Sequence, residues 1–403
     1  APTRVEDPEA TAARLESTAA RYRQAAAAYH GRARFIGFAD HRRRPNTTVG
    51  ELYVPLRLSR RGQDALRWQD FRGAVNMREM PPFNPDGVTG FFSAHAPAFV
   101  QKHELWTTAT IVERLSAGPS VLGAARIVVL GGPGSGKTTL CRFLSVVIAG
   151  EIRLPGIAPE RSLIPLLLPF REYTRESASL SIFEFLYRQA GTELSIALPE
   201  GFLEDVLEAG QAVILLDGLD EVGRPEDRAV MRDRVMAFCR AYPRTPLLVT
   251  SRIAGYDEAP LAADGREGFV HLELAAFEDE DLREFVRRWY AIQEPDDPVA
   301  RDRGIADLSA AMTAEPRITE LARNPMLATL IALIHRFEAH LPGERAKLYE
   351  LCIKTLLDTW PAATGRQFQE IDTGLQRVYL EKLAYAIQSG RQSDDQAVVI
   401  GQG

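Results

Sequence analysis

The chain has 403 residues, of which 45% are hydrophobic and 25% are charged, and its formal net charge is −6. These values are ordinary for globular proteins, and the length predicts about two to four domains. The acidic balance argues against a nucleic-acid partner, and no segment reaches the roughly 18 apolar residues of a membrane-spanning helix. Three scattered cysteines without a metal-binding spacing predict reduced, mostly buried thiols. We therefore expect a cytoplasmic protein without a membrane partner.

The first hundred residues combine a helical pattern with turn-rich sequence. Residues 1–30 have helical periodicity, residues 51–58 contain a candidate strand, and residues 104–117 are predicted to form a helix. The run from Arg42 to Arg44 is interpreted as a solvated loop rather than a phosphate patch, because short charge runs usually face water. Residues 1–100 are therefore expected to form an N-terminal helical and linker region.

Residues 131–138 read Gly-Gly-Pro-Gly-Ser-Gly-Lys-Thr and fit the phosphate-binding pattern G-x-x-x-x-G-K-[ST]. An apolar run, 126–130, precedes the motif and a helical pattern follows it, which is the context the motif requires. In such a loop, backbone N–H groups surround a phosphate at a helix N-terminus. Lys137 is expected to reach the β- and γ-phosphates and to assist catalysis, and the Thr138 hydroxyl to bind Mg²⁺. The predicted nucleotide-binding residues of the loop are Gly131, Gly132, Pro133, Gly134, Ser135, Gly136, Lys137, Thr138 and Thr139.

Short apolar segments alternate with helical stretches from residue 125 to residue 275. The predicted strands are 126–130, 163–169, 212–216, 246–250 and 269–274. This alternation predicts an α/β fold, with a parallel sheet and helices on both of its faces. Ligands of such sheets lie beyond the carboxyl ends of the strands.

Acidic residues follow the third of these strands. Asp217 comes directly after the apolar run and is expected to hold the hydration shell of Mg²⁺ opposite Thr138. Gly218 stands where many P-loop ATPases place a catalytic Glu, and acids return at Asp220 and Glu221. Either of these two can orient or deprotonate the attacking water. The alternative is that they only cap the next segment.

Arg252 follows the fourth strand, in the sequence Thr250-Ser251-Arg252. A guanidinium at this edge of the sheet can form a charge-assisted bond with the γ-phosphate. A surface arginine is the default for a single residue. Because Arg252 falls in register with the two other motifs, we predict that it senses the γ-phosphate.

Two helices are predicted in the C-terminal half. Residues 277–286 begin with acids and continue with apolar residues at helical spacing, which predicts an N-capped amphipathic helix. Asn324-Pro325 opens a nearly all-apolar helix, since proline fits the first turn without loss of a hydrogen bond.

On Gly131–Thr138, on Asp217-Gly218-Leu219-Asp220-Glu221 and on Thr250-Ser251-Arg252, the chain resembles the NACHT NTPases of the STAND class of P-loop ATPases. Residues 165–172 look like the second strand of that family and the arginine that follows it. Arg323 to Leu330 looks like its helical-domain segment, in which Pro325 would contact the adenine.

The resemblance implies three domains in series. They are a P-loop NTPase domain at 101–275, a small helical domain at 276–340, and a winged-helix domain at 341–403 that we expect to be incomplete. It also implies ATP or ADP and Mg²⁺ as ligands.

The implied function is a slow, Mg²⁺-dependent ATPase used as a switch, closed with ADP and self-associating with ATP. Bacterial members resemble immune sensors that act against phage, so effector and sensor domains beyond this chain, or an activating phage protein, are the expected partners. Two alternatives stay open. One is a continuously cycling AAA-like remodelling ATPase, and the other is a winged-helix transcription regulator, against which the lack of a strongly basic face after residue 340 argues.

Overall fold

The computed structural model describes residues 8–32, 47–60, 105–119, 123–157, 161–177, 180–223, 225–261, 268–338, 345–355, 357 and 373–393. The chain divides into two compact units. The first holds most of the chain as far as Ile305 together with Arg323–Met326, and the second holds Ala306–Ala322 and the chain from Leu327 onward. The predicted arginine run Arg42–Arg44 lies outside the described residues, as do residues 341–344, 356, 358–372 and 394–403 of the predicted winged-helix domain. The domain boundaries expected from the sequence stay predictions.

A seven-stranded, mostly parallel sheet forms the centre of the first unit, with strand order β2-β1-β7-β3-β6-β5-β4. The parallel strands are β3 (Arg126–Leu130), β4 (Ile164–Pro169), β5 (Ala212–Asp217), β6 (Leu247–Ser251) and β7 (Phe269–Leu274). Each agrees with a predicted strand to within one residue at either end. The predicted α/β class with a largely parallel sheet is therefore confirmed.

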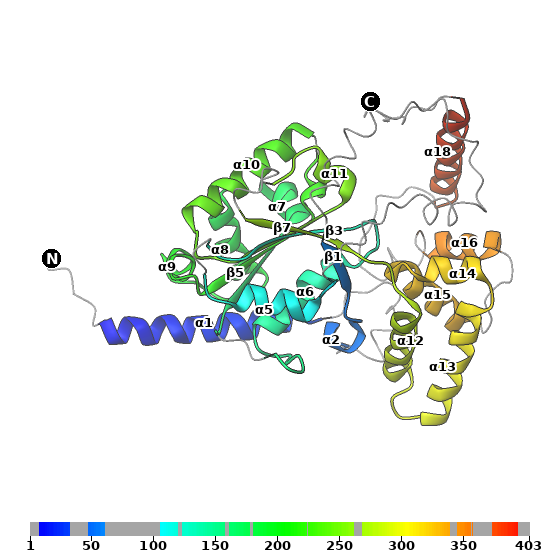
Figure 1. Cartoon of the computed structure of the whole chain (residues 1–403), viewed down its shortest axis with the longest axis horizontal. Coiled ribbons are helices and arrows are strands. Elements are labelled where there is room, and N and C mark those ends of the chain that lie inside the picture. The colour runs from blue at the N-terminus through cyan, green and yellow to red at the C-terminus, as the bar shows by residue number, and fades with distance from the viewer. Residues whose placement is uncertain are drawn as a thin grey trace, which may run out of the picture. The chain divides into compact units, whose positions relative to one another are not determined.

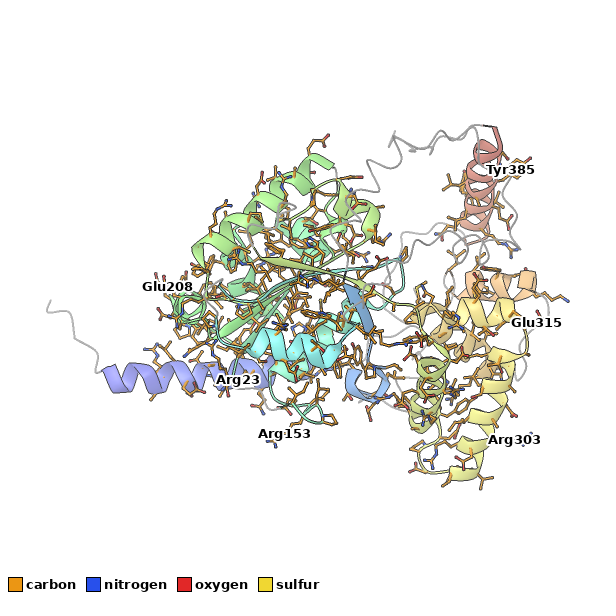
Figure 2. All side chains as sticks on the ribbon, in the orientation of Figure 1. Arg23, Arg153, Glu208, Arg303, Glu315 and Tyr385 are labelled. Carbon is orange, nitrogen blue, oxygen red and sulfur yellow. The ribbon has the colours of Figure 1, made fainter. Side chains whose placement is uncertain are left out.

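Helices cover both faces of the sheet, because its strands are apolar on both sides. All residues of β5 are buried, as is typical of a parallel strand that is covered twice. Figure 1 shows α1, α5 and α6 on one face and α7, α10 and α11 on the other. Figure 2 shows side chains filling the layers between the sheet and these helices. The helices of this part are α1 (Pro8–His30), α2 (Val49–Leu52), α5 (Thr108–Ser116), α6 (Lys137–Ile148), α7 (Phe170–Ser177), α8 (Ile182–Thr192), α9 (Phe202–Glu208), α10 (Pro225–Ala241), α11 (Ile253–Asp257) and the 3₁₀ turn η3 (Leu219–Glu221).

The N-terminal part differs from the sequence-based expectation at two places. The candidate strand at 51–58 is largely wrong, because the Thr48–Glu51 capping box starts α2 and only β1 (Arg57–Arg60) is a strand. The predicted helix at 104–117 begins with β2 (Leu105–Thr107), and α5 starts after it, where the Thr107 hydroxyl accepts the N–H of Thr110. Strands β1 and β2 extend the sheet in the antiparallel sense, since β1 pairs with β7 on one side and β2 on the other.

The later helices follow the predicted patterns. Helix α12 (Asp279–Gln293) begins at a Glu278–Asp281 capping box, as predicted, and buries Leu282, Phe285, Val286 and Trp289. Helix α15 begins at Pro325, and Leu330 to Ile334 are almost fully buried. The remaining helices are α13 (Pro298–Thr313), α14 (Pro316–Ala322), α15 (Pro325–Glu338), α16 (Arg345–Lys354) and α18 (Thr373–Ser393).

Two further sequence-based expectations concern cysteines and membrane helices. Cys141, Cys239 and Cys352 are all buried and free, as predicted. Among the described residues, no helix combines the length and apolarity that crossing a bilayer requires.

Candidate functional site

The loop between β3 and α6 has the conformation that a phosphate-binding loop needs. Gly134 and Gly136 have φ angles of 72° and 94°, in the left-handed region that glycine adopts without strain. Gly136 is the N-cap of α6, so the loop ends at a helix N-terminus. A Cβ on Gly131 would lie 2.5 Å from the hydroxyl oxygen of Ser135, which explains a glycine there. That buried hydroxyl has no hydrogen-bond partner among the described residues.

Lys137 lies across this loop. Its ammonium group donates hydrogen bonds to the carbonyl oxygens of Gly131 (2.7 Å) and Gly132 (2.9 Å). Burial lowers the pKa of Lys137, and the charge of Asp220 opposes that shift. The cation is therefore held at the loop by two neutral acceptors, for which charged phosphate oxygens would be stronger replacements.

Asp217 lies at the carboxyl end of β5 and is only 8% exposed. Its carboxylate accepts a hydrogen bond from the Thr250 hydroxyl (2.7 Å) and another from the Thr138 hydroxyl. Burial raises the pKa of Asp217, and both hydrogen bonds lower it. The structure thus brings together Thr138 and Asp217, the two predicted Mg²⁺ ligands. A hydroxyl and a carboxylate are hard oxygen donors, which fit Mg²⁺.

Thr250 is a residue of the site that the sequence reasoning did not assign a role. It is fully buried at the end of β6, next to Asp217. Its hydroxyl accepts the N–H of Gly218 (2.9 Å) while it donates to Asp217. The pairing of Leu216 with Val249 on the neighbouring strands already places Thr250 beside Asp217. The sequence signal that could have identified Thr250 is a polar residue near the end of the strand that lies next to β5.

Asp220 and Arg252 form a two-point contact. One carboxylate oxygen of Asp220 accepts the Arg252 backbone N–H at 2.8 Å, and the other lies 3.0 Å from the Arg252 Nε. The Asp220 side chain is 9% exposed, whereas that of Arg252 is 51% exposed. The predicted γ-phosphate sensor is therefore paired with one of the two predicted catalytic acids.

Gly255 permits this contact, a role that the sequence patterns did not predict. It lies in α11, the helix that begins directly after Arg252. A Cβ on Gly255 would come 2.6 Å from the Cβ of Asp220. Helix α11 can approach η3 this closely only because residue 255 has no side chain.

Glu221 is the other predicted acid, at the end of η3. Although its side chain as a whole is exposed, desolvation of the carboxyl group raises its pKa. The charges of Asp217 and Asp220 raise this pKa further, while Arg171 and Arg252 lower it. A raised pKa makes a carboxylate a better proton acceptor near neutral pH. Asp220 and Glu221 thus both remain candidates for the catalytic base.

The segment around Pro325 lies against the phosphate loop. The side-chain amide of Asn324 donates to the carbonyl oxygen of Pro133 (2.9 Å), and the Met326 N–H donates to that of Gly134 (3.2 Å). Pro325 is thereby placed beside the loop. The adenine contact expected for it stays a prediction.

A comparison with protein families supports a nucleotide site at these residues. The family model for the NACHT domain matches residues 125–293. These residues form a NACHT domain. The match spans the phosphate loop, Asp217, the acids of η3 and Arg252, and it supports a nucleotide-binding NTPase domain at these residues.

The solved structures that are similar to this chain share little of its sequence. The Walker-type ATPase PABY2304 of Pyrococcus abyssi is 12% identical, with a TM-score of 0.36 over 69% of this chain and 74% of that chain. A single-substitution variant of RuvB from Thermotoga maritima is 12% identical, with a TM-score of 0.28 over 58% of this chain and 62% of that chain. A second RuvB variant is also 12% identical, with a TM-score of 0.28 over 58% of this chain, and this chain spans 63% of its length. No curated protein matches the sequence.

Proposed function

We propose that the chain is an ATP- and ADP-binding switch whose nucleotide state controls its self-association. The observation that carries the proposal is the contact between Asp220 and Arg252. Arg252 is expected to sense the γ-phosphate, and Asp220 is one of the two acids expected to orient or deprotonate the attacking water. A single rearrangement can therefore change both nucleotide recognition and hydrolysis.

The pair is suited to an exchange of partners. The guanidinium of Arg252 is half exposed, and exposed ion pairs stabilise proteins by only about 0–1 kcal/mol. A γ-phosphate offers several anionic oxygens and stronger charge-assisted hydrogen bonds. Only ATP presents that group, so ATP and ADP differ in affinity for the rearranged state. Such a difference is what a ligand needs to shift a conformational equilibrium.

Each residue of the site would have its own role in ATP hydrolysis. Thr138 and Asp217 would hold Mg²⁺, which supplies positive charge at the β- and γ-phosphate oxygens. Lys137 would move from the loop carbonyls to the phosphates. Asp220 or Glu221 would take the proton of the attacking water.

Slow turnover follows from the same contact. While Arg252 contacts both oxygens of Asp220, fewer acceptor positions of that carboxylate are left to orient water. This favours a switch over the remodelling ATPase, which must complete the site in every cycle. The amount of nucleotide bound after purification separates the two, because a switch should retain ADP and a continuously cycling ATPase should not.

A role in bacterial immunity against phage is the biological setting we propose, and it rests on the family resemblance. Its partners would be further copies of the chain, effector and sensor domains, and a triggering ligand such as a phage protein. A cytoplasmic location is consistent with three free thiols.

The proposal is tested with Arg252→Ala. We expect the variant to bind ADP with wild-type affinity and to lose the increase in light scattering that a non-hydrolysable ATP analogue causes in the wild type. The matched control is Arg153→Ala, which removes an exposed arginine beyond the far end of α6. If Arg252→Ala assembles on the ATP analogue as the control does, Arg252 does not sense the γ-phosphate and the proposed switch is wrong.

A further inference from the structure

The segment Arg323–Met326, which we call the loop clasp, contacts the phosphate loop at two successive peptide groups. Asn324 donates its side-chain amide to the Pro133 carbonyl at 2.9 Å. The Met326 N–H donates to the Gly134 carbonyl at 3.2 Å. The same N–H also donates to the side-chain oxygen of Asn324 at 3.0 Å, which caps α15.

The absence of a side chain at Gly134 lets the clasp approach the loop closely enough to form these hydrogen bonds. A Cβ on Gly134 would lie 2.7 Å from the side-chain oxygen of Asn324 and 2.8 Å from the Cβ of Met326. Real Cβ atoms do not approach other atoms so closely, so the clasp fits only against a glycine. The φ angle of 72° at Gly134 independently favours glycine at this position.

The clasp fixes the direction of the loop's N–H groups. In a trans peptide the C=O and the N–H point in opposite directions, and the described residues contain no cis peptide bond. Holding the Pro133 carbonyl toward Asn324 therefore turns the Gly134 N–H to the other side. The Ser135 N–H, opposite the held Gly134 carbonyl, points back into the loop, where it donates to Gly132 at 3.3 Å. Backbone N–H groups that face into such a loop are the donors that surround a bound phosphate, for which the Ser135 N–H would give up the Gly132 carbonyl.

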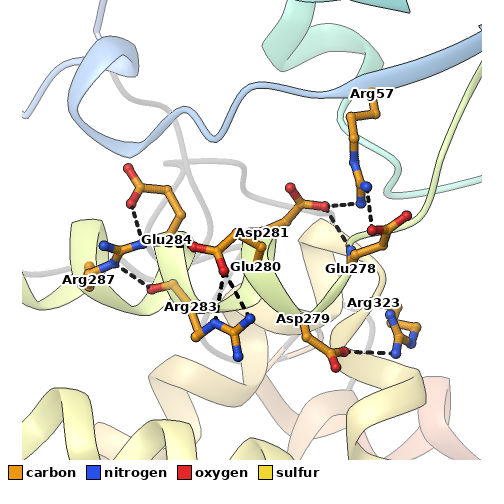
Figure 3. Close-up of polar contacts among 9 residues, drawn as sticks. All are labelled: Arg57, Glu278, Asp279, Glu280, Asp281, Arg283, Glu284, Arg287 and Arg323. Atoms are coloured by element: carbon orange, nitrogen blue, oxygen red, sulfur yellow. Dashed lines mark hydrogen bonds and ion pairs between the residues drawn. The ribbon is translucent and has the colours of Figure 1, made fainter. Parts of the chain in front are cut away.

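The other end of the clasp is anchored to the start of α12. The Phe277 N–H donates to the carbonyl oxygen of Arg323 at 2.9 Å, and the Arg323 guanidinium donates to the carbonyl oxygen of Phe277 at 2.8 Å. Its guanidinium also pairs with Asp279 at 2.9 Å (Figure 3). On the opposite side of the same helix start, Arg57 pairs with Glu278 and Asp281, each at 2.5 Å. The clasp thus connects the N-terminus of α12 with the phosphate loop.

We propose that Asn324 is a positioning residue for the phosphate loop, which orients the loop's N–H groups toward the β-phosphate of the nucleotide. Its action is separate from the adenine contact expected for Pro325. The inference rests on nucleotide binding at the loop and does not require the proposed switch.

Two substitutions separate positioning from helix capping. Asn324→Ser keeps a side-chain oxygen that can cap α15, but serine is too short to reach the Pro133 carbonyl. Asn324→Ala removes both interactions. We expect the thermal midpoint to fall for Asn324→Ala and to stay near the wild-type value for Asn324→Ser.

Nucleotide affinity is the readout that capping alone does not change. ADP and AMP are each competed against a fluorescent ADP analogue. Loss of one hydrogen bond predicts about three- to tenfold weaker ADP binding in both variants, with AMP binding nearly unchanged because AMP has no β-phosphate. Wild-type ADP affinity in Asn324→Ser would show that Asn324 only caps the helix. An equal loss for ADP and AMP would place its effect at the base and also overturn the inference.

Lys137→Ala serves as the reference in the same assay. It removes the flexible cation at the loop and should weaken ADP binding more than either Asn324 variant. If Lys137→Ala binds ADP as the wild type does, the loop is not the nucleotide site, and the failure lies with that assignment rather than with Asn324.

Discussion

Two buried carboxylates at and just after the end of β5 lie three positions apart and differ in their hydrogen-bond partners. Asp217 is buried and accepts hydrogen bonds from two neutral hydroxyl groups, those of Thr138 and Thr250. The Asp220 side chain is also buried, at 9% exposed, but its side-chain partner is the half-exposed guanidinium of Arg252. A buried carboxylate held by buried hydroxyl groups is costly to disturb, whereas an ion pair whose cation is open to water separates more readily. We infer that the Asp217 side of the site is fixed and that the Asp220 side is exchangeable.

The largest expected effect comes from breaking the fixed side. Asp217→Asn keeps an acceptor for the Thr250 hydroxyl but removes the charge that would hold Mg²⁺. Loss of an outer-shell partner typically costs 10–100-fold in metal affinity, and because Asp217 also supplies the negative charge, we expect a loss of at least about 100-fold. We expect Mg²⁺-dependent ATP binding and hydrolysis to disappear, measured by titration with and without Mg²⁺. Unchanged Mg²⁺ dependence would mean that Asp217 has only a structural role.

The next effect concerns the exchangeable side. Asp220→Asn should retain ATP binding and lose about 10²–10⁴-fold in hydrolysis rate, because positioning a water molecule matters only for the chemical step. Glu221→Gln is the matched variant one position away. A wild-type rate in Asp220→Asn together with a loss in Glu221→Gln would make Glu221 the base.

A smaller effect is expected at Thr250, which tests whether the fixed side depends on a hydroxyl. Thr250→Val keeps the shape but leaves the Gly218 N–H and the Asp217 carboxylate each without this partner. We expect about 10–100-fold weaker Mg²⁺ affinity, as for other residues that orient a metal ligand. Thr250→Ser restores the hydroxyl and should restore Mg²⁺ affinity. A serine variant as impaired as the valine variant would point to packing of the methyl group instead.

Local sequence was enough to predict the parallel strands and the phosphate loop. Strand formation depends on short apolar runs, and the loop on glycines at fixed spacing, so both are visible within a few residues. The contact between Asn324 and Pro133 joins residues 191 positions apart, and the approach of Gly255 to Asp220 depends on how two elements pack. Neither has a local signature. The same holds for β1, whose partner β7 lies more than 200 positions later in the chain.

The smallest expected effect is on stability, and it compares the two sides most directly. Removing the Thr250 hydroxyl leaves buried polar groups unsatisfied, which typically costs about 1–3 kcal/mol. Removing the exposed Arg252 guanidinium should change the free energy of unfolding by less than about 1 kcal/mol. Urea denaturation of Thr250→Val and Arg252→Ala without added nucleotide measures both, provided that each protein unfolds in a single transition. Raising the salt concentration should reduce the Arg252 effect further, because exposed charges are screened, and should leave the Thr250 effect unchanged. If Arg252→Ala destabilises the protein as much as Thr250→Val does, the Asp220 contact is a structural lock, and the division into fixed and exchangeable sides does not hold.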